Sequence, residues 1–269
     1  SRGKTLMAAL VAILVNENTL SPDTNDLFPE WRGEGDRRKS IAVEHLLRMT
    51  SGLDFDAPHA RMLSDVRTML FLEGDSAAYA KSEKLVDPVG STFFYASGST
   101  TLLASAMRGV VAGGQAAYFS YPWKALFEPL GMTSAVLEPD AAGTFLAPAF
   151  VHASARDWAR LGQFYLQDGV WQGQRLLPRG WVAKQRTATK QSGGEYGAHL
   201  WVRIPAFLRP SFANAYRLPD DAFFMLGHDG QIVAMFPSQD LVVVRLGLSR
   251  RRIAWDHEAF LHEVLEAFR

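Results

Sequence analysis

The first four residues, Ser1-Arg2-Gly3-Lys4, place a serine hydroxyl and a lysine amine three positions apart, in front of the apolar run 6–15. Positions i and i+3 lie on the same face of a helix, so the Lys4 amine is expected beside the Ser1 hydroxyl. Burial against apolar neighbours would lower the pKa of the amine and let it accept the serine proton. The spacing therefore indicates a serine nucleophile with a lysine base. A serine N-cap followed by a surface lysine is the alternative.

The start of this helix is also expected to stabilise negative charge. Its first N–H groups have no acceptor within the helix and carry partial positive charge, so the Ser1 N–H could face a developing oxyanion. Gly3 would leave room for close approach of the substrate.

The segment Tyr95-Ala96-Ser97 is a second candidate, expected in a loop before a helix that begins at Ser99. A tyrosine there can relay protons when a nearby cation favours its phenolate, and Ser97 can hydrogen-bond the lysine or the substrate. Aromatic core packing is the alternative for Tyr95. A rival segment, Tyr118-Phe119-Ser120, lacks the turn before it and the helix start after it.

The third candidate is the segment Gly227-His228-Asp229-Gly230-Gln231, which lies between two strand-like segments. Gly230 would let the substrate lie close against an edge strand. The Gln231 N–H could then be the second oxyanion donor, opposite the Ser1 N–H. A glycine-rich bend with an exposed histidine at His228 is the alternative.

The elements that would position these residues are mixed in type. Hydrophobic periodicity and turn residues predict strands at 222–226, 232–236 and 241–248 and helices at 5–17, 41–49, 75–84, 99–111, 121–130, 155–166 and 255–268. The helix at 5–17 is apolar almost all round, which predicts that it is buried. The segment Ser154–Asp157 is typical of a capping box.

This order predicts an α+β fold in which an antiparallel sheet is flanked by helices and joined by a mostly helical lobe. We expect one domain over 1–269, with a helical lobe at about 20–195 and a sheet lobe from 1–18 and about 196–269. Three strands are few for so much helix, so further strands are expected upstream of residue 1, missing from this chain or supplied by a separate segment.

Composition excludes several classes of protein. The 28 basic residues balance 28 acidic ones, which disfavours nucleic-acid binding, and there is no cysteine for a disulfide, a thiolate metal ligand or a thiol nucleophile. No apolar run reaches the length of a membrane span, and no cleavage site follows the opening segment to support a signal peptide. Structural or surface roles without metal binding are expected for His45, His59, His152, His199, His257 and His262.

Together and in this order, the three candidate segments resemble the serine β-lactamase and penicillin-binding-protein superfamily. Its motifs are S-x-x-K, then Tyr-x-Asn or Ser-x-Asn, then Lys-x-Gly or a histidine variant. The tyrosine form is similar to the class C branch, which also holds esterases, D-stereospecific peptidases and 6-aminohexanoate-oligomer hydrolases. Further segments resemble family landmarks, namely LLRMTSGL at 46–53, FEPLGM at 127–132, SARD at 154–157 and YG at 196–197 with Trp201.

The resemblance implies a serine hydrolase that acts through an acyl-serine on an ester, amide or β-lactam bond of a small or peptide-like substrate, without metal or cofactor. Ser1 would be acylated, Lys4 and Tyr95 would share the acid–base work, and the Ser1 and Gln231 N–H groups would hold the oxyanion. Ser97 stands where the family has asparagine and His228 where it has lysine, which favours an esterase or amidase over a strict β-lactamase.

Two other classes remain open. One is a binding or scaffold protein of the same fold that has lost turnover. The other is an N-terminal-nucleophile hydrolase with the Ser1 α-amine as base, although a helix starting at residue 5 fits it poorly. The sequence assigns no oligomeric state, and periplasmic, secreted and cytoplasmic locations are all compatible with it.

Overall fold

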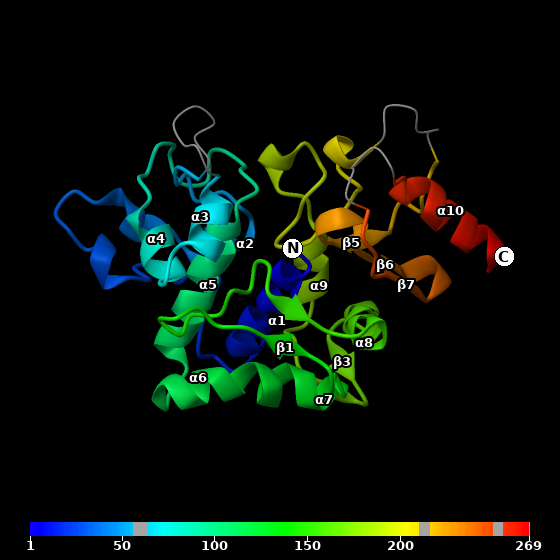
Figure 1. Ribbon diagram of the computed structural model, residues 1–269, viewed down its shortest axis with the longest axis horizontal. Coiled ribbons are helices and arrows are strands. Elements are labelled where there is room, and N and C mark those ends of the chain that lie inside the picture. The colour runs from blue at the N-terminus through cyan, green and yellow to red at the C-terminus, as the bar shows by residue number, and fades with distance from the viewer. Residues whose placement is uncertain (56–63, 210–215, 250–254, 269) are drawn as a thin grey trace.

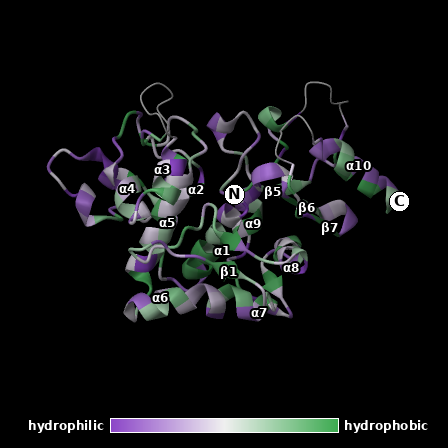
Figure 2. Cartoon of the chain, viewed as in Figure 1, coloured by the Kyte–Doolittle hydropathy of each residue, from purple (hydrophilic) through white to green (hydrophobic). Residues whose placement is uncertain are grey.

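A helix that is buried on all sides forms the centre of the molecule. The computed structural model describes residues 1–55, 64–209, 216–249 and 255–268. Helix α1 (Gly3–Asn16) runs between a group of helices and a three-stranded sheet (Figure 1), and every residue from Gly3 to Leu14 is buried. The buried helix that the apolar pattern predicts is therefore confirmed, and Figure 2 shows the hydrophobic ribbon around it. Among the described residues, no helix has the length and hydropathy needed to cross a bilayer.

The helical part wraps one side of α1. It contains α2 (Val43–Leu47), α3 (Asp65–Phe71), α4 (Ser76–Ser82), α5 (Ser97–Val110) and α6 (Gly114–Pro122), which continues through a π-helical turn at Trp123–Phe127 into α7 (Glu128–Leu130). The sequence predicts this last helix only from Tyr121. The left-handed backbone of Gly113, with φ of 99°, turns the chain sharply enough for α6 to begin directly at Gly114.

The sheet lies on the other side of α1 and has the strand order β5-β6-β7, all antiparallel. Its strands are β5 (Phe223–Leu226), β6 (Ile232–Phe236) and β7 (Leu241–Arg245). Alternate residues point to opposite faces of a strand. Phe224 and Ala234 accordingly pack in the cluster that includes α10 (His257–Ala267), whereas Met225 and Val233 join the main core around α1.

The third strand is shorter than the predicted 241–248. Arg245 pairs with Ile232, which is the first residue of β6, so the ladder has no partner beyond this point. The remaining elements are the two-stranded ladders β1 (Val136–Leu137) with β2 (Val151–His152) and β3 (Val170–Trp171) with β4 (Gln174–Arg175), and helix α9 (Trp181–Arg186). Short 3₁₀ turns lie at 29–31, 37–40, 190–192, 206–208, 228–230 and 237–239.

Helix α8 (Ala155–Leu166) packs against β6 and β7, although its sequence position falls within the range 20–195 predicted for the helical lobe. Gly162 makes this contact possible, because a Cβ there would lie 2.6 Å from a methyl group of Val242. At the start of α8, only one of the two hydrogen bonds of the predicted capping box is present. The Ser154 hydroxyl accepts from the Asp157 N–H, but the Asp157 carboxylate accepts from Ser134 instead of reaching back to the Ser154 N–H.

We expect Asp157→Ala to destabilise the protein by about 2–4 kcal/mol, because the buried carboxylate accepts hydrogen bonds from Ser134 N, Ser134 Oγ and Arg160 Nη1. Urea unfolding at pH 7 measures the change. Asp220→Ala is the matched control, since Asp220 pairs with Arg217 on the open surface and should cost less than about 0.5 kcal/mol. Equal effects for the two variants would contradict a structural role for Asp157.

Candidate active site

The structure brings the side chains of Ser1, Lys4 and Ser97 together at the start of α1. The Lys4 Nζ lies 3.2 Å from the Ser1 Oγ and 3.2 Å from the Ser97 Oγ. Ser1 precedes α1 and Lys4 lies in its first turn, so the i, i+3 spacing sets the first contact. Ser97 is the first residue of α5, not part of a loop as the sequence predicts. Two helix starts therefore converge on one amine.

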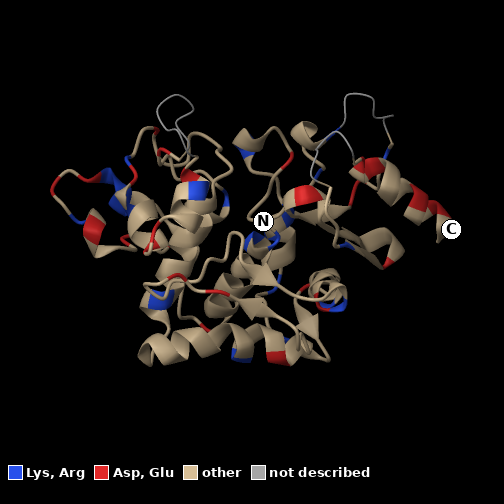
Figure 3. Cartoon of the chain, viewed as in Figure 1, with Lys and Arg blue, Asp and Glu red and all other residues tan. Residues whose placement is uncertain are grey.

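The Lys4 amine is buried, with 2 % of the residue exposed. Burial penalises the charged form and lowers the pKa of Lys4 to about 7. Among the described residues the partners of this amine are hydroxyls and not carboxylates, and Figure 3 shows blue ribbon at the start of α1 set among mostly uncharged segments. Near neutral pH a large part of Lys4 is therefore the free amine, which can accept a proton.

Tyr95 lies over the same amine and remains protonated at neutral pH. The Lys4 Nζ is 4.8 Å from the centre of its ring. Burial raises the pKa of Tyr95 to about 12, and hydrogen bonds with the side chains of Ser1 and Trp201 offset part of this effect. The phenol is thus suited to donate a proton, rather than to act as a standing phenolate.

The segment at 46–53 holds Tyr95 and Ser97 in place through Met49. The Phe94 N–H donates to the Met49 carbonyl at 2.9 Å, and the Ala96 N–H to the Met49 sulfur at 3.5 Å. Tyr95 lies between these two bonds, which hold the backbone on both sides of it and so position its ring beside Lys4. The rival Tyr118 is buried elsewhere in the core, where its hydroxyl donates to the Ala104 carbonyl.

His199 is buried close to Lys4 and bonds three of the elements that surround the amine. Its Nδ1 bonds the Leu47 carbonyl at 2.7 Å and its Nε2 bonds Thr100 Oγ1 at 2.8 Å, while its own carbonyl accepts from Thr5 Oγ1. Burial lowers the pKa of His199 to about 3. The imidazole is therefore neutral, and it ties α1, α2 and α5 together beside Lys4.

The loop at 227–231 forms the facing wall of the pocket, which Gly230 lines. Gly230 has φ of +78° in a 3₁₀ turn, and a Cβ there would meet Arg245 at 2.8 Å, so its small size serves the turn and this contact. The Gln231 N–H points to the His228 carbonyl at 3.4 Å, and Gln231 does not line the pocket. The His228 side chain is 89 % exposed beside Asp229.

Arg2 connects this loop to the start of α1, beside Ser1. Its Nη2 donates to Gln231 Oε1 at 2.6 Å, and its guanidinium lies 4.5 Å from the centre of the Trp158 ring. Gly3, by contrast, does not face the substrate as the sequence suggests. A Cβ there would lie 2.2 Å from the Ala147 carbonyl oxygen, so Gly3 is required for packing.

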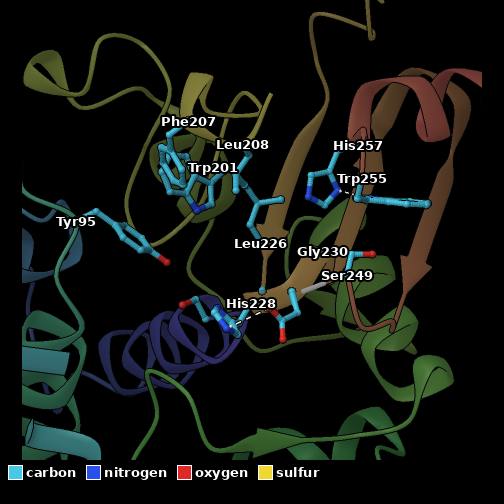
Figure 4. Close-up of a pocket in the computed structure, with 13 residues that line it drawn as sticks. Tyr95, Trp201, Phe207, Leu208, Leu226, His228, Gly230, Ser249, Trp255 and His257 are labelled. Carbon is cyan, nitrogen blue, oxygen red and sulfur yellow. Dashed lines mark hydrogen bonds and ion pairs between the residues drawn. The ribbon is translucent and has the colours of Figure 1, made fainter. Parts of the chain in front are cut away.

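A pocket of about 270 Å³ opens beside Ser1 (Figure 4). Its lining consists of Ser1, Tyr95, Trp201, Phe207, Leu208, Leu226, Gly227, His228, Asp229, Gly230, Ser249, Trp255 and His257. The sequence motifs contain the first two of these residues and the loop at 227–230. Trp201 stands in the landmark segment that begins at Tyr196, whereas the remaining wall residues carry no motif and lie far from Ser1 in sequence, so no spacing could identify them.

The other histidines divide into three groups. His45, His152 and His262 bond neighbours outside the pocket, at Ala42, Glu138 and Glu266. His59 lies outside the described residues. His257 differs from the expectation of a purely structural or surface role, because it lines the pocket.

A model of the Beta-lactamase family matches residues 1–251, which is most of the chain and includes the whole site described above. The chain belongs to the Beta-lactamase family. The search of curated proteins returned no significant match.

Several solved structures resemble this chain in fold. A candidate 6-aminohexanoate-dimer hydrolase from Bacillus anthracis is 21% identical with a TM-score of 0.72, covering 99% of this chain and 69% of that one. A family VIII carboxylesterase is 15% identical with a TM-score of 0.74, covering 100% and 82%. A penicillin-binding protein homologue from Caulobacter crescentus is 18% identical with a TM-score of 0.69, also covering 100% and 82%. At these identities the likeness establishes the fold, which is α+β.

We expect Lys4→Met to stabilise this Beta-lactamase family protein by about 2–4 kcal/mol at pH 7, even though it removes the site's amine. In the unfolded chain lysine keeps its ordinary pKa, whereas the folded value is about 7. Folding near neutral pH must therefore release a proton or bury a charge, and this cost disappears as the pH rises toward the ordinary lysine value.

Urea unfolding of wild type and Lys4→Met at pH 7 and pH 10 measures this difference. The exposed Lys124→Met is the matched control and should change little at either pH. A Lys4→Met protein that is less stable than wild type at pH 7 would contradict the buried, uncompensated amine.

Proposed function

We propose that this protein is a serine hydrolase that forms an acyl-serine at Ser1 on a small ester or amide. The observation that carries the proposal is the buried Lys4 amine, which lies 3.2 Å from Ser1 Oγ and has a pKa lowered to about 7. An amine in this state can activate an adjacent hydroxyl at neutral pH. Membership of the Beta-lactamase family is consistent with this chemistry.

In the proposed acylation step, the neutral Lys4 amine accepts the Ser1 proton as Oγ attacks the substrate carbonyl carbon. The carbonyl oxygen becomes an oxyanion near the backbone nitrogen of Ser1 and the N–H of Gln231. Gln231 itself does not line the pocket, but it follows Gly230, which does, and its N–H makes only a 3.4 Å bond within the loop, so in this proposal it turns toward the pocket and exchanges this acceptor for the oxyanion. The Tyr95 hydroxyl then donates its proton to the departing oxygen or nitrogen, and the Lys4 ammonium restores it.

In the proposed deacylation step, water attacks the acyl carbon and gives up its proton to the same pair of groups. Ser1 Oγ leaves as an alkoxide and takes a proton back from Lys4. Ser97 donates or accepts at the amine throughout, which keeps Lys4 directed at Ser1. No residue outside this cluster needs to move a proton.

The site favours esters and amides over β-lactams. The His228 side chain is largely exposed and its Nε2 lies 3.2 Å from Asp229 Oδ1, so the carboxylate of a penicillin would meet the negative charge of Asp229 at this wall. Two of the structural neighbours are named for the hydrolysis of such bonds, one as a carboxylesterase and one as an aminohexanoate-dimer hydrolase.

A substrate panel tests the function. We expect measurable kcat/KM for a p-nitrophenyl hexanoate, a lower value for a short amide and the lowest for benzylpenicillin. Ser1→Ala, Lys4→Met and Tyr95→Phe should each lower the ester kcat/KM by about 10²–10⁴-fold. For the wild type, the rate should rise with pH through a midpoint near 7, because only the neutral Lys4 amine accepts the serine proton.

A protein that hydrolyses none of these substrates in a Ser1-dependent manner would overturn the proposal. Labelling of Ser1 by an activated ester without turnover would instead support the binding or scaffold alternative. A pH–rate midpoint near 10 would contradict Lys4 as the base while leaving Ser1 as nucleophile.

A further inference from the structure

The pocket beside Ser1 has a polar wall that the proposed mechanism does not use. His257 and Trp255 lie on this wall, on the opposite side of the pocket from Tyr95 (Figure 4). Much of the remaining lining is apolar and comes from Trp201, Phe207, Leu208 and Leu226. In a pocket with apolar walls such as these, a few precisely placed polar groups fix the orientation of the substrate and contribute specificity.

The hydrogen bond between Trp255 and His257 fixes where the histidine carries its proton. The indole Nε1 lies 3.2 Å from His257 Nδ1. An indole nitrogen can only donate, so Nδ1 must accept and the ring proton must lie on Nε2. Burial lowers the pKa of His257 to about 4, and the positive charge of Arg245 acts in the same direction. The imidazole is therefore a neutral group with one N–H donor.

Arg245 holds this wall rigid. Its guanidinium lies 3.6 Å from the centre of the Trp255 ring, while Nη1 donates to the Gly230 carbonyl at 2.7 Å and Nη2 donates to Ser249 Oγ at 2.8 Å. The indole consequently cannot turn away from His257. The guanidinium is also directed at protein acceptors instead of at a substrate.

The Nε2–H of His257 has no acceptor within the part of the chain that the structure describes. His257 is 4 % exposed, and because it lines the pocket this small exposed part opens into it. A donor that is buried except toward a substrate pocket is unsatisfied until an acceptor arrives.

We propose that His257 is a specificity-determining residue whose Nε2–H donates to an uncharged oxygen, such as a ketone or amide carbonyl, on the acyl group of the substrate. This inference rests on the proposed function. The acyl group is the relevant part because Tyr95, the donor to the leaving group, lies on the opposite wall. An uncharged acceptor is favoured because Asp229 lines the same pocket and the Arg245 guanidinium faces the protein.

Matched esters test the inference. The probes are p-nitrophenyl hexanoate, its 4-oxo and 5-oxo analogues, and the p-nitrophenyl monoester of adipic acid, which carries a carboxylate. We expect wild type to prefer one oxo ester over the hexanoate by about 3- to 10-fold in kcat/KM. His257→Phe should bring this ratio close to one, and His257→Gln, whose amide can still donate, should restore part of it.

Two further variants guard against trivial explanations. His262→Phe changes a histidine of the same helix outside the pocket and should leave the ratio as in wild type. Trp255→Phe keeps an aromatic ring under Arg245 but removes the N–H that fixes the tautomer, so it should also lower the ratio. This variant tests the inference even where a His257 variant fails to fold.

An oxo-to-hexanoate ratio that is equal in wild type and both His257 variants would overturn the inference, as would a preference for the carboxylate ester. These results are distinct from a failure of the proposed function. In that case none of the esters would be hydrolysed in a Ser1-dependent manner.

Discussion

The organisation of this protein depends on one amine that is kept out of water, with no carboxylate beside it in the described part of the chain. Lys4 is buried at the start of a helix whose residues are buried as far as Leu14. A lysine that formed an ion pair there would stay charged and could not accept a proton. Burial without a counter-charge instead lowers its pKa to about 7. The fold therefore sets the chemistry of the site through desolvation.

The elements around α1 follow from this requirement. Packing on all sides of α1, by α5 on one face and by the core side of the sheet on another, excludes water from the amine. The ends of these elements then supply polar groups at its edge, with Ser97 from α5 and Tyr95 from the segment that Met49 holds. Stability and reactivity are in conflict at this position, because the burial that lowers the pKa of Lys4 also opposes the folding of the chain.

The sequence predicts the parts of the site that depend on local spacing. The contact of Ser1 with Lys4 follows from the helical repeat, and the buried helix follows from a continuous apolar run. The predicted bounds of strands β5, β6 and β7 agree with the structure to within a few residues, because alternating hydrophobic residues and turn residues mark these strands. The resemblance to the β-lactamase superfamily is confirmed by the match over 1–251.

Features that depend on tertiary contacts were not accessible in this way. The Asp157 carboxylate bonds Ser134 in preference to the local N–H, β7 ends where its partner strand ends, and α6 begins early after a left-handed glycine. Trp255 and His257 reach the pocket from a segment far from Ser1 in the sequence, and no local pattern links them to it. The folded chain alone brings them together.

The proposed chemistry requires that Lys4 is largely neutral at physiological pH. The most direct measurement is an NMR titration of the protein with ¹⁵N-labelled lysine side chains, in which Lys4→Met identifies the Lys4 signal by its absence. We expect the Lys4 amine to titrate near pH 7, well below the surface lysines. Titration of Lys4 near pH 10, together with the other lysines, would contradict the account.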